Sequence, residues 1–312
     1  MTWMQESIKN GHYVWMDGQY IKWGEANVHI MTHAMHYASS VFDGVRSYDG
    51  YLLALEPHIQ RLRYSFNLLE CDYKYSNEDL ANTCYELIKR NNIKQGYIRL
   101  LAWCGTDKIT VAAPGIDTHV AIAAWERPAA YVKQKETGLT LYTSKWRRPH
   151  PSTFPAQSKA ASMYPASFLA KHEASRNGYD EAMLLDYQGN IAEASSSNLF
   201  FVIDGKLLTP RPTCFLNGIT KQIVQILAHN LGIPCAEASI TPHDLPKATE
   251  AFITGTATEI TPIREITYLD QKFTYQVPGT ITAQLVTAFQ EVINKRSVLN
   301  WNVLSQQKEI II

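Results

Sequence analysis

The sequence is poor in cysteine and has no excess of charge. Its five cysteines are scattered and never form Cys-x-x-Cys, which argues against a disulfide framework and against a zinc site, and favours a reducing compartment. Lysine and arginine number 29, as do aspartate and glutamate, so there is no global field to gather nucleic acid or an anionic membrane. We therefore expect neither partner, and any anion site must be local.

Long apolar runs are missing as well. No stretch reaches the length of a membrane span, and residues 1–13 are polar where a signal peptide needs an apolar run, so we expect a cytoplasmic protein. Glycine-rich dinucleotide fingerprints, P-loops and Gly-x-Ser-x-Gly elbows are absent from the sequence. His33 and His36 lie three residues apart, but no third ligand stands at a familiar spacing, so no metal site is expected.

The length of 312 residues is sufficient for about two domains. We predict a small N-terminal α+β domain over 1–126, a linker over the charged, glycine-terminated stretch 127–138, and a larger C-terminal α+β domain over 139–312. Because strands and helices do not alternate regularly, two α+β domains are favoured over one doubly wound sheet.

Hydrophobic periodicity predicts the individual elements. Helices are expected over 55–69, 76–88, 164–177, 219–231 and 281–295, and strands over 13–16, 20–23, 40–42, 97–103, 119–125, 139–142, 182–186, 198–203 and 251–253. The pair Asp43-Gly44 is expected to follow the end of a strand.

Lys159 is the first candidate for chemistry. A lysine used as a nucleophile must be desolvated or lie near positive charge, and Lys159 stands among small and apolar residues. Most lysines are solvated, so Lys159 alone is weak evidence. Tyr164 has the phenol to hydrogen-bond a pyridine hydroxyl, and Glu193 has the carboxylate to pair with a pyridinium nitrogen. Together the three groups indicate a site for pyridoxal 5'-phosphate, although Tyr164 also suits a core position and Glu193 an exposed strand edge.

Two turns are candidate binding sites for an anion. Residues 216–220 open a helix with free amides, a glycine and a hydroxyl, a combination that binds a phosphate dianion but also occurs in ordinary caps. Residues 254–259 form a second amide-rich turn, for the same phosphate or a substrate carboxylate. Arg61 lies beside the apolar stripe of helix 55–69, where it either reaches an anion or is merely solvated.

Eight motifs occur in order along nearly the whole chain: residues 28–37, 40–46, 58–62, 97–99, Lys159 with Tyr164, 193–200, 216–220 and 255–262. In these motifs the sequence resembles the fold-type IV pyridoxal-phosphate aminotransferases, most closely the branched-chain amino acid aminotransferases. The resemblance implies the two-domain α+β fold of the D-amino acid aminotransferase type, with pyridoxal 5'-phosphate as cofactor. It also implies an amino donor, a 2-oxo acid acceptor, and a homodimer or higher homo-oligomer in which a neighbouring subunit's loop closes the site.

The resemblance also implies roles for individual residues. Lys159 is the expected catalytic residue, which binds the cofactor covalently and then moves the proton at the substrate α-carbon. The expected cofactor-binding residues are Arg61, Tyr164, Glu193, Asn198, Gly218, Ile219, Thr220 and Thr256. The expected substrate-binding residues are Tyr37, Phe42, Arg46, Tyr97, Arg99, Tyr131 and Ala257, with Arg99 placed to clamp the second carboxylate of glutamate.

We therefore predict transfer of the amino group of L-leucine, L-isoleucine and L-valine to 2-oxoglutarate. Two departures leave alternatives open: residues 193–198 lack two glycines and a carboxylate that close relatives carry, and residues 103–114 diverge. The alternatives are a D-amino acid or (R)-amine transaminase of the same fold, an aminodeoxychorismate lyase, and a non-enzymatic pyridoxal-phosphate-binding protein.

Overall fold

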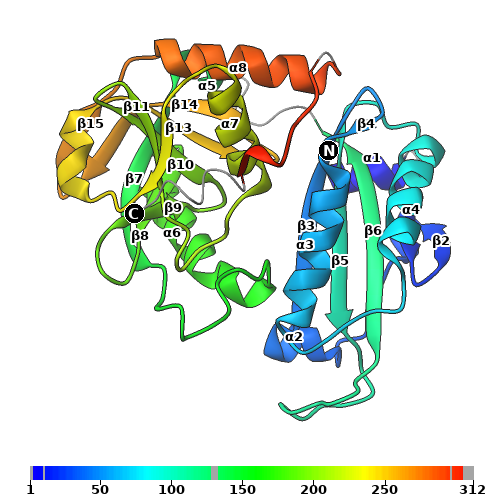
Figure 1. Cartoon of the computed structure of the whole chain (residues 1–312). Helices are drawn as coiled ribbons and strands as arrows, with labels where there is room; N and C mark the ends of the chain where they lie inside the picture. Colours follow the sequence, from blue (N-terminus) through cyan, green and yellow to red (C-terminus); the bar gives the residue numbers. More distant parts are fainter. Residues whose placement is uncertain (1–2, 10, 128–132, 296, 305–312) are drawn as a thin grey trace. The chain divides into compact units, whose positions relative to one another are not determined.

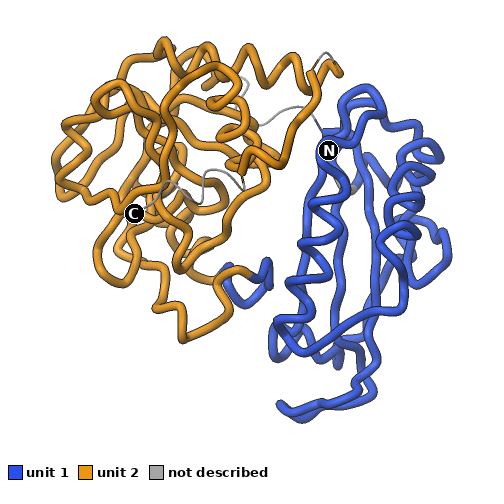
Figure 2. The backbone as a smooth tube through the Cα atoms, viewed as in Figure 1, with its two compact units in different colours: residues 1–128, 158–164 blue, residues 129–157, 165–312 orange. Residues whose placement is uncertain are grey.

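The computed structural model describes residues 3–9, 11–127, 133–295 and 297–304 (Figure 1). The chain divides into two compact units (Figure 2): unit 1 comprises Met1–Pro128 and Ser158–Tyr164, and unit 2 comprises Ala129–Gln157 and Pro165–Ile312. The bounds expected for the two domains stay a prediction. The division differs from them at Ser158–Tyr164, which holds Lys159 and groups with the N-terminal unit.

Unit 1 contains a six-stranded sheet whose described strands follow the order β2-β1-β6-β5-β3-β4. The strands are β1 (Tyr13–Met16), β2 (Gln19–Lys22), β3 (Ser40–Tyr48), β4 (Tyr51–Leu52), β5 (Gly96–Cys104) and β6 (Thr118–Glu126). The predicted hairpin β1-β2 is confirmed, and its turn residues Asp17 and Gly18 both have positive φ, 49° and 93°.

Strand β3 does not end before Asp43-Gly44, so the predicted end at Phe42 was wrong. The strand continues antiparallel to β5, with Asp43 opposite Leu100 and Gly44 opposite Arg99. A Cβ on Gly44 would lie 1.7 Å from the hydroxyl of Tyr97, so the glycine makes room for a ring instead of forming a turn.

Four helices accompany this sheet: α1 (Trp3–Lys9), α2 (His33–Tyr37), α3 (Leu55–Asn67) and α4 (Asn77–Arg90), with a 3-10 turn η1 at Trp23–Glu25. Helix α3 contacts β3 and β5, and α4 contacts β1 and β6. The inner stripe of α3 is fully buried at Ile59, Leu62 and Phe66, as its periodicity predicts. Ser76 caps α4 in a reciprocal capping box with Asp79.

Unit 2 contains a nine-stranded sheet with the order β12-β11-β10-β13-β14-β7-β8-β9, and β15 pairs with β14. The strands are β7 (Leu139–Arg147), β8 (Glu181–Leu185), β9 (Ile191–Ala194), β10 (Asn198–Ile203), β11 (Lys206–Pro210), β12 (Cys235–Ala238), β13 (Ala248–Gly255), β14 (Glu259–Tyr268) and β15 (Gln271–Thr274). The sequence did not predict β9, β11, β12, β14 or β15. It placed β10 and β13, which lie near the centre of the sheet and are mostly buried on both faces, but it missed their neighbour β14.

The helices that continue the chain are α5 (Gln134–Thr137), α6 (Tyr164–Arg176), α7 (Ile219–Asn230) and α8 (Thr280–Ile293), with 3-10 turns η2 at Ala161–Met163 and η3 at Pro242–Lys247. Helix α5 lies inside the segment that was predicted to be a linker. Helices α7 and α8 contact each other, and both contact β13. Among the described residues, no helix is long and apolar enough to cross a membrane.

Candidate functional site

The backbone around Lys159 is fixed to β3 and α3 within unit 1. The carbonyl oxygen of Lys159 accepts a hydrogen bond from the amide of Phe42 at 3.1 Å, and the next residue, Ala160, forms an antiparallel bridge with Val41. The amide of Lys159 donates to Ser65 Oγ of α3 at 2.9 Å. The lysine is therefore held by a strand edge and a helix, although it lies outside both, and this gives its side chain a fixed starting point.

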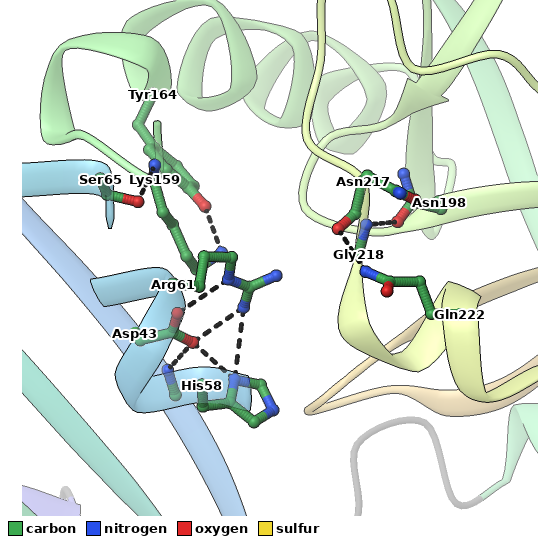
Figure 3. A network of polar contacts seen from close by, with 11 residues as sticks. Asp43, His58, Arg61, Ser65, Lys159, Tyr164, Asn198, Asn217, Gly218 and Gln222 are labelled. Atoms are coloured by element: carbon green, nitrogen blue, oxygen red, sulfur yellow. Dashed lines mark hydrogen bonds and ion pairs between the residues drawn. The ribbon is translucent and has the colours of Figure 1, made fainter. Parts of the chain in front are cut away.

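The side chain of Lys159 reaches Tyr164, as the sequence predicts. Its Nζ lies 3.0 Å from Tyr164 Oη (Figure 3). The same Nζ lies 5.1 Å from the centre of the Phe42 ring and 5.6 Å from that of Tyr164, and the two rings are 4.8 Å apart. The side chain of this half-buried lysine thus places its amine beside two aromatic rings and next to a phenol, which is a suitable setting for a covalent lysine.

Arg61 is bound by a carboxylate that the sequence analysis did not single out. Asp43 is fully buried; it accepts from Arg61 Nε and Nη2 at 2.8 Å each, and from His58 Nδ1 at 2.7 Å (Figure 3). Burial by itself would raise the pKa of Asp43, but Arg61 and His58 hold that pKa well below its usual range. Burial lowers the pKa of His58, and Asp43 only partly opposes it. Neutral His58 therefore carries its proton on Nδ1, because the ionised Asp43 can only accept.

Four expected substrate-binding residues project from one face of the unit 1 sheet. Successive side chains of a strand point to opposite faces, so Phe42 and Arg46 of β3 lie on the face opposite Asp43. Arg46 pairs across the sheet with Tyr97 of β5, which places Tyr97 and Arg99 on the same face as Phe42 and Arg46. The guanidinium carbon of Arg99 lies 4.6 Å from the Phe42 ring centre and 5.6 Å from the Tyr97 ring centre. Arg99 Nε is buried and has no hydrogen-bond partner within the described ranges, so this cation retains a donor for a ligand.

The remaining expected substrate residues are less enclosed. Tyr37 on α2 is exposed, and its hydroxyl donates to the carbonyl oxygen of Ile109 at 3.2 Å. Ala257 is half-buried in the turn after β13. Tyr131 lies outside the described residues.

Glu193 lies in unit 2, inside β9, and is 7% exposed. The sequence placed it just after the turn at residues 187–190, and it lies there, but within a strand that the sequence did not predict. The alternative of an exposed strand edge was wrong. Glu193 Oε1 lies 2.8 Å from Arg148 Nε, and Arg148 Nη2 donates to Ser167 Oγ at 2.7 Å. Arg148, which the sequence analysis did not connect with Glu193, therefore places a positive charge beside this buried carboxylate.

The expected phosphate seat is the turn that leads into α7. Asn198, the first residue of β10, accepts from the amide of Gly218 at 3.1 Å (Figure 3). It also donates to the carbonyl oxygen of Leu216 at 3.0 Å. A Cβ on Gly218 would lie 2.2 Å from Asn198 Oδ1, so this close approach requires glycine. Gly218, the N-cap of α7, has no side chain to accept hydrogen bonds from the first amides of the helix. A helix start of this kind is suited to binding an anion.

The turn between β13 and β14 supplies further polar groups. Ser197 Oγ lies 3.3 Å from Thr258 Oγ1, and Thr256 beside it is half-buried. The hydroxyl of Thr254 is almost fully buried and has no hydrogen-bond partner in the part of the chain that the structure describes. Ser197 stands where close relatives were expected to carry a carboxylate, so here a pair of hydroxyl groups occupies the position.

The donor groups suit pyridoxal 5'-phosphate. The amine of Lys159 matches the aldehyde, the phenol of Tyr164 the ring hydroxyl, and the carboxylate of Glu193 the ring nitrogen. Arg61 and the start of α7 match the phosphate. Each functional group of the cofactor thus has a chemically complementary partner in one unit or the other.

Comparisons with known proteins agree with this chemistry. The family model described as Amino-transferase class IV matches residues 40–266. The probable branched-chain-amino-acid aminotransferase of Rickettsia felis is 38% identical over 264 residues, which cover 84% of this chain and 90% of that protein. The structure of the branched-chain amino acid aminotransferase of Escherichia coli matches with a TM-score of 0.88 and 34% identity, over 93% of this chain and 97% of that chain. The enzyme of the same name from Thermobaculum terrenum, solved in its pyridoxal-phosphate form, matches with a TM-score of 0.83 and 32% identity, over 92% and 95% of the two chains.

Proposed function

The chain belongs to the class IV aminotransferases, and from this we propose that it transfers the amino group of L-leucine, L-isoleucine and L-valine to 2-oxoglutarate, with pyridoxal 5'-phosphate as cofactor. The predicted family, the α+β fold class and the enzyme class are confirmed. The names of the similar proteins support the branched-chain substrates. The single observation that carries the proposal is the contact of Lys159 Nζ with Tyr164 Oη at 3.0 Å.

Lys159 is the proposed catalytic residue. The bound cofactor supplies an electron sink for the charge that develops at the α-carbon of the amino donor. Lys159 Nζ takes the proton from that carbon, and the adjacent Tyr164 hydroxyl orients the amine. The flanking rings of Phe42 and Tyr164 exclude water from one side of Nζ.

The proposed cofactor-binding residues divide by the group that they would hold. Glu193, which pairs with Arg148, holds the ring nitrogen, and Tyr164 holds the ring hydroxyl. The phosphate is held by Arg61, Gly218, Ile219, Thr220 and Thr256, and Asn198 holds the Gly218 turn in place. These assignments are supported by donor chemistry and burial.

For the substrate, we propose a carboxylate role for Arg99 and an apolar role for Phe42. Arg99 lies over the Phe42 ring, and its buried Nε has no hydrogen-bond partner among the described residues, so it suits a second carboxylate beside an apolar surface. This arrangement accommodates both glutamate and a branched aliphatic donor. Tyr37, Arg46, Tyr97, Tyr131 and Ala257 complete the proposed substrate residues.

We also propose a homodimer, located in the cytoplasm. Exposed apolar side chains gather on two segments of unit 1: Val28, Ile30, Met31, Met35 and Tyr37 on the first, and Ile109 and Val111 on the second. The segments contact each other through Tyr37 and through His33, whose Nε2 lies 3.1 Å from the Thr110 carbonyl oxygen. Adjoining exposed apolar segments of this kind are typical of protein interfaces. All five cysteines are free, which suits a reducing compartment.

A panel of amino donors tests the proposal. The purified holoenzyme is mixed with L-leucine, D-alanine or (R)-1-phenylethylamine, and the loss of the visible absorbance of the cofactor is recorded. L-leucine should react fastest, and 2-oxoglutarate should restore the absorbance. Preference for either other donor would replace the substrate assignment, and release of pyruvate from aminodeoxychorismate would replace the reaction class.

A further inference from the structure

Lys221 is completely buried at the start of α7, which is an unusual position for a lysine. It belongs to the first turn of the helix, where the backbone dipole disfavours a positive charge, and its side chain is 0% exposed. Burial lowers the pKa of Lys221, and Glu237 opposes that shift. A buried ion pair contributes little stability compared with apolar packing, so stability alone does not account for a cation here.

The contacts of Lys221 connect the helix to the turn that precedes it. Nζ lies 2.5 Å from Glu237 Oε1 on β12 and donates to Asn217 Oδ1 at 3.1 Å. The backbone carbonyl of Asn217 accepts from Gln222 Nε2 at 3.3 Å, a contact that Figure 3 shows beside Gly218. Lys221 and Gln222 therefore hold Asn217 by its side chain and by its main chain, immediately before the glycine of the expected phosphate seat.

We infer that Lys221 is a positioning residue for the phosphate-binding turn 217–220. Its ammonium group, held in place by Glu237, fixes Asn217 and thereby orients the amides that follow Gly218 toward an anion. The inference rests on the proposed function, in which the start of α7 holds the cofactor phosphate.

The test compares two ligands that differ only in the phosphate. The dissociation constants of pyridoxal 5'-phosphate and of pyridoxal are measured by absorbance titration of the full chain after removal of the cofactor. For Lys221→Met, affinity for pyridoxal 5'-phosphate should fall about 10-fold or more, the loss expected for one hydrogen bond to a charged group. Affinity for pyridoxal should stay the same, because pyridoxal does not use the seat.

Two further variants serve as controls. Lys221→Arg retains the charge and should recover most of the lost affinity. Lys272→Met removes the lysine of another Lys–Glu pair in unit 2, with Glu265 at 3.0 Å, but this lysine is largely exposed, so its loss should change neither constant.

If Lys221→Met does not fold, Asn217→Ala tests whether the contact between Lys221 and Asn217 supports phosphate binding. It removes the acceptor but leaves the Lys221–Glu237 pair, so it should show the same loss for the phosphorylated ligand alone. Equal losses for both ligands, or no loss for either, would overturn the inference. If the unaltered protein binds pyridoxal 5'-phosphate tightly and the variants match it, the inference alone fails. If the unaltered protein binds neither ligand, the proposed function fails together with it.

Discussion

Arg61 of α3 donates two hydrogen bonds, each 2.8 Å long, to the fully buried carboxylate of Asp43 on β3. This bidentate pair joins a helix to a strand and leaves the outer nitrogen of the guanidinium available to another anion. The same strand carries Phe42, which contacts Lys159. The expected phosphate ligand and the expected catalytic lysine of unit 1 are therefore both fixed to β3.

Asp43→Asn should weaken both the fold and cofactor binding. Removal of one partner leaves a buried guanidinium without its counterion, which costs about 3–5 kcal/mol of stability. The melting temperature and the affinity for pyridoxal 5'-phosphate should both fall. Asp72→Asn is the matched control, since Asp72 pairs with Arg63 at 2.5 Å but is 59% exposed, and it should have little effect. If the two variants behave alike, Asp43 does not hold Arg61.

His58 should make the protein less stable as the pH falls below neutrality. Burial lowers its pKa in the folded state below the ordinary 6.5, so the unfolded chain binds a proton more readily. Its contribution is fully present above pH 6.5 and is lost as the pH falls toward the folded value, at up to about 1.4 kcal/mol per pH unit. The melting temperature of the unaltered protein should drop between pH 7 and pH 5.

His58→Asn keeps a donor for Asp43 but does not titrate. Its drop in melting temperature over the same range should therefore be smaller than that of the unaltered protein. His36→Asn, at an exposed position, should not reduce the drop. The account of His58 fails if both variants follow the unaltered protein.

Arg99→Met should separate the two substrates of the proposed reaction. If Arg99 clamps the second carboxylate, its loss removes a charged hydrogen bond worth about 2 kcal/mol, which lowers kcat/KM for glutamate roughly 30-fold. For L-leucine, which has no second carboxylate, kcat/KM should change far less. Steady-state kinetics with each donor measure the ratio, and equal losses for the two donors would contradict the assignment.

Glu250→Gln should destabilise unit 2 without altering the chemistry of the protein. Glu250 accepts from the amides of Ile281 and Thr282 at 3.0 and 2.8 Å, and so caps the start of α8 from β13. Loss of this charged cap should cost about 1–2 kcal/mol and lower the melting temperature. Glu291→Gln, an exposed position in the same helix, should not lower it. Activity per folded molecule should remain unchanged in both variants.

The sequence predicted the elements whose periodicity is local, and it was wrong where distant residues decide the structure. Asp43-Gly44 is typical of a turn, yet β3 runs through it. Arg61 neutralises the buried carboxylate, His58 donates a hydrogen bond to it, and Tyr97 fills the space above the glycine. These partners are distant in sequence, so no local window contains the signal.

For the candidate site, motifs indicated Lys159, Tyr164 and Arg61 but not their supports. Arg148 was not connected with Glu193, because the two residues are distant in sequence and an arginine next to a strand end is usually solvated. Lys221 follows the motif directly, but a lysine on a helix gives no sign of burial. Strand β9, which holds Glu193, was missed because four residues with two alanines and a glutamate have little strand propensity.

The covalent attachment of the cofactor to Lys159 is the central claim, and reductive trapping tests it most directly. The holoenzyme is treated with borohydride, digested, and mapped by mass spectrometry, with Lys159→Ala processed in parallel. The account predicts a single modified peptide that contains Lys159, and none in the variant. Modification of another lysine, such as the buried Lys221, or no modification of the cofactor-saturated protein, would contradict it.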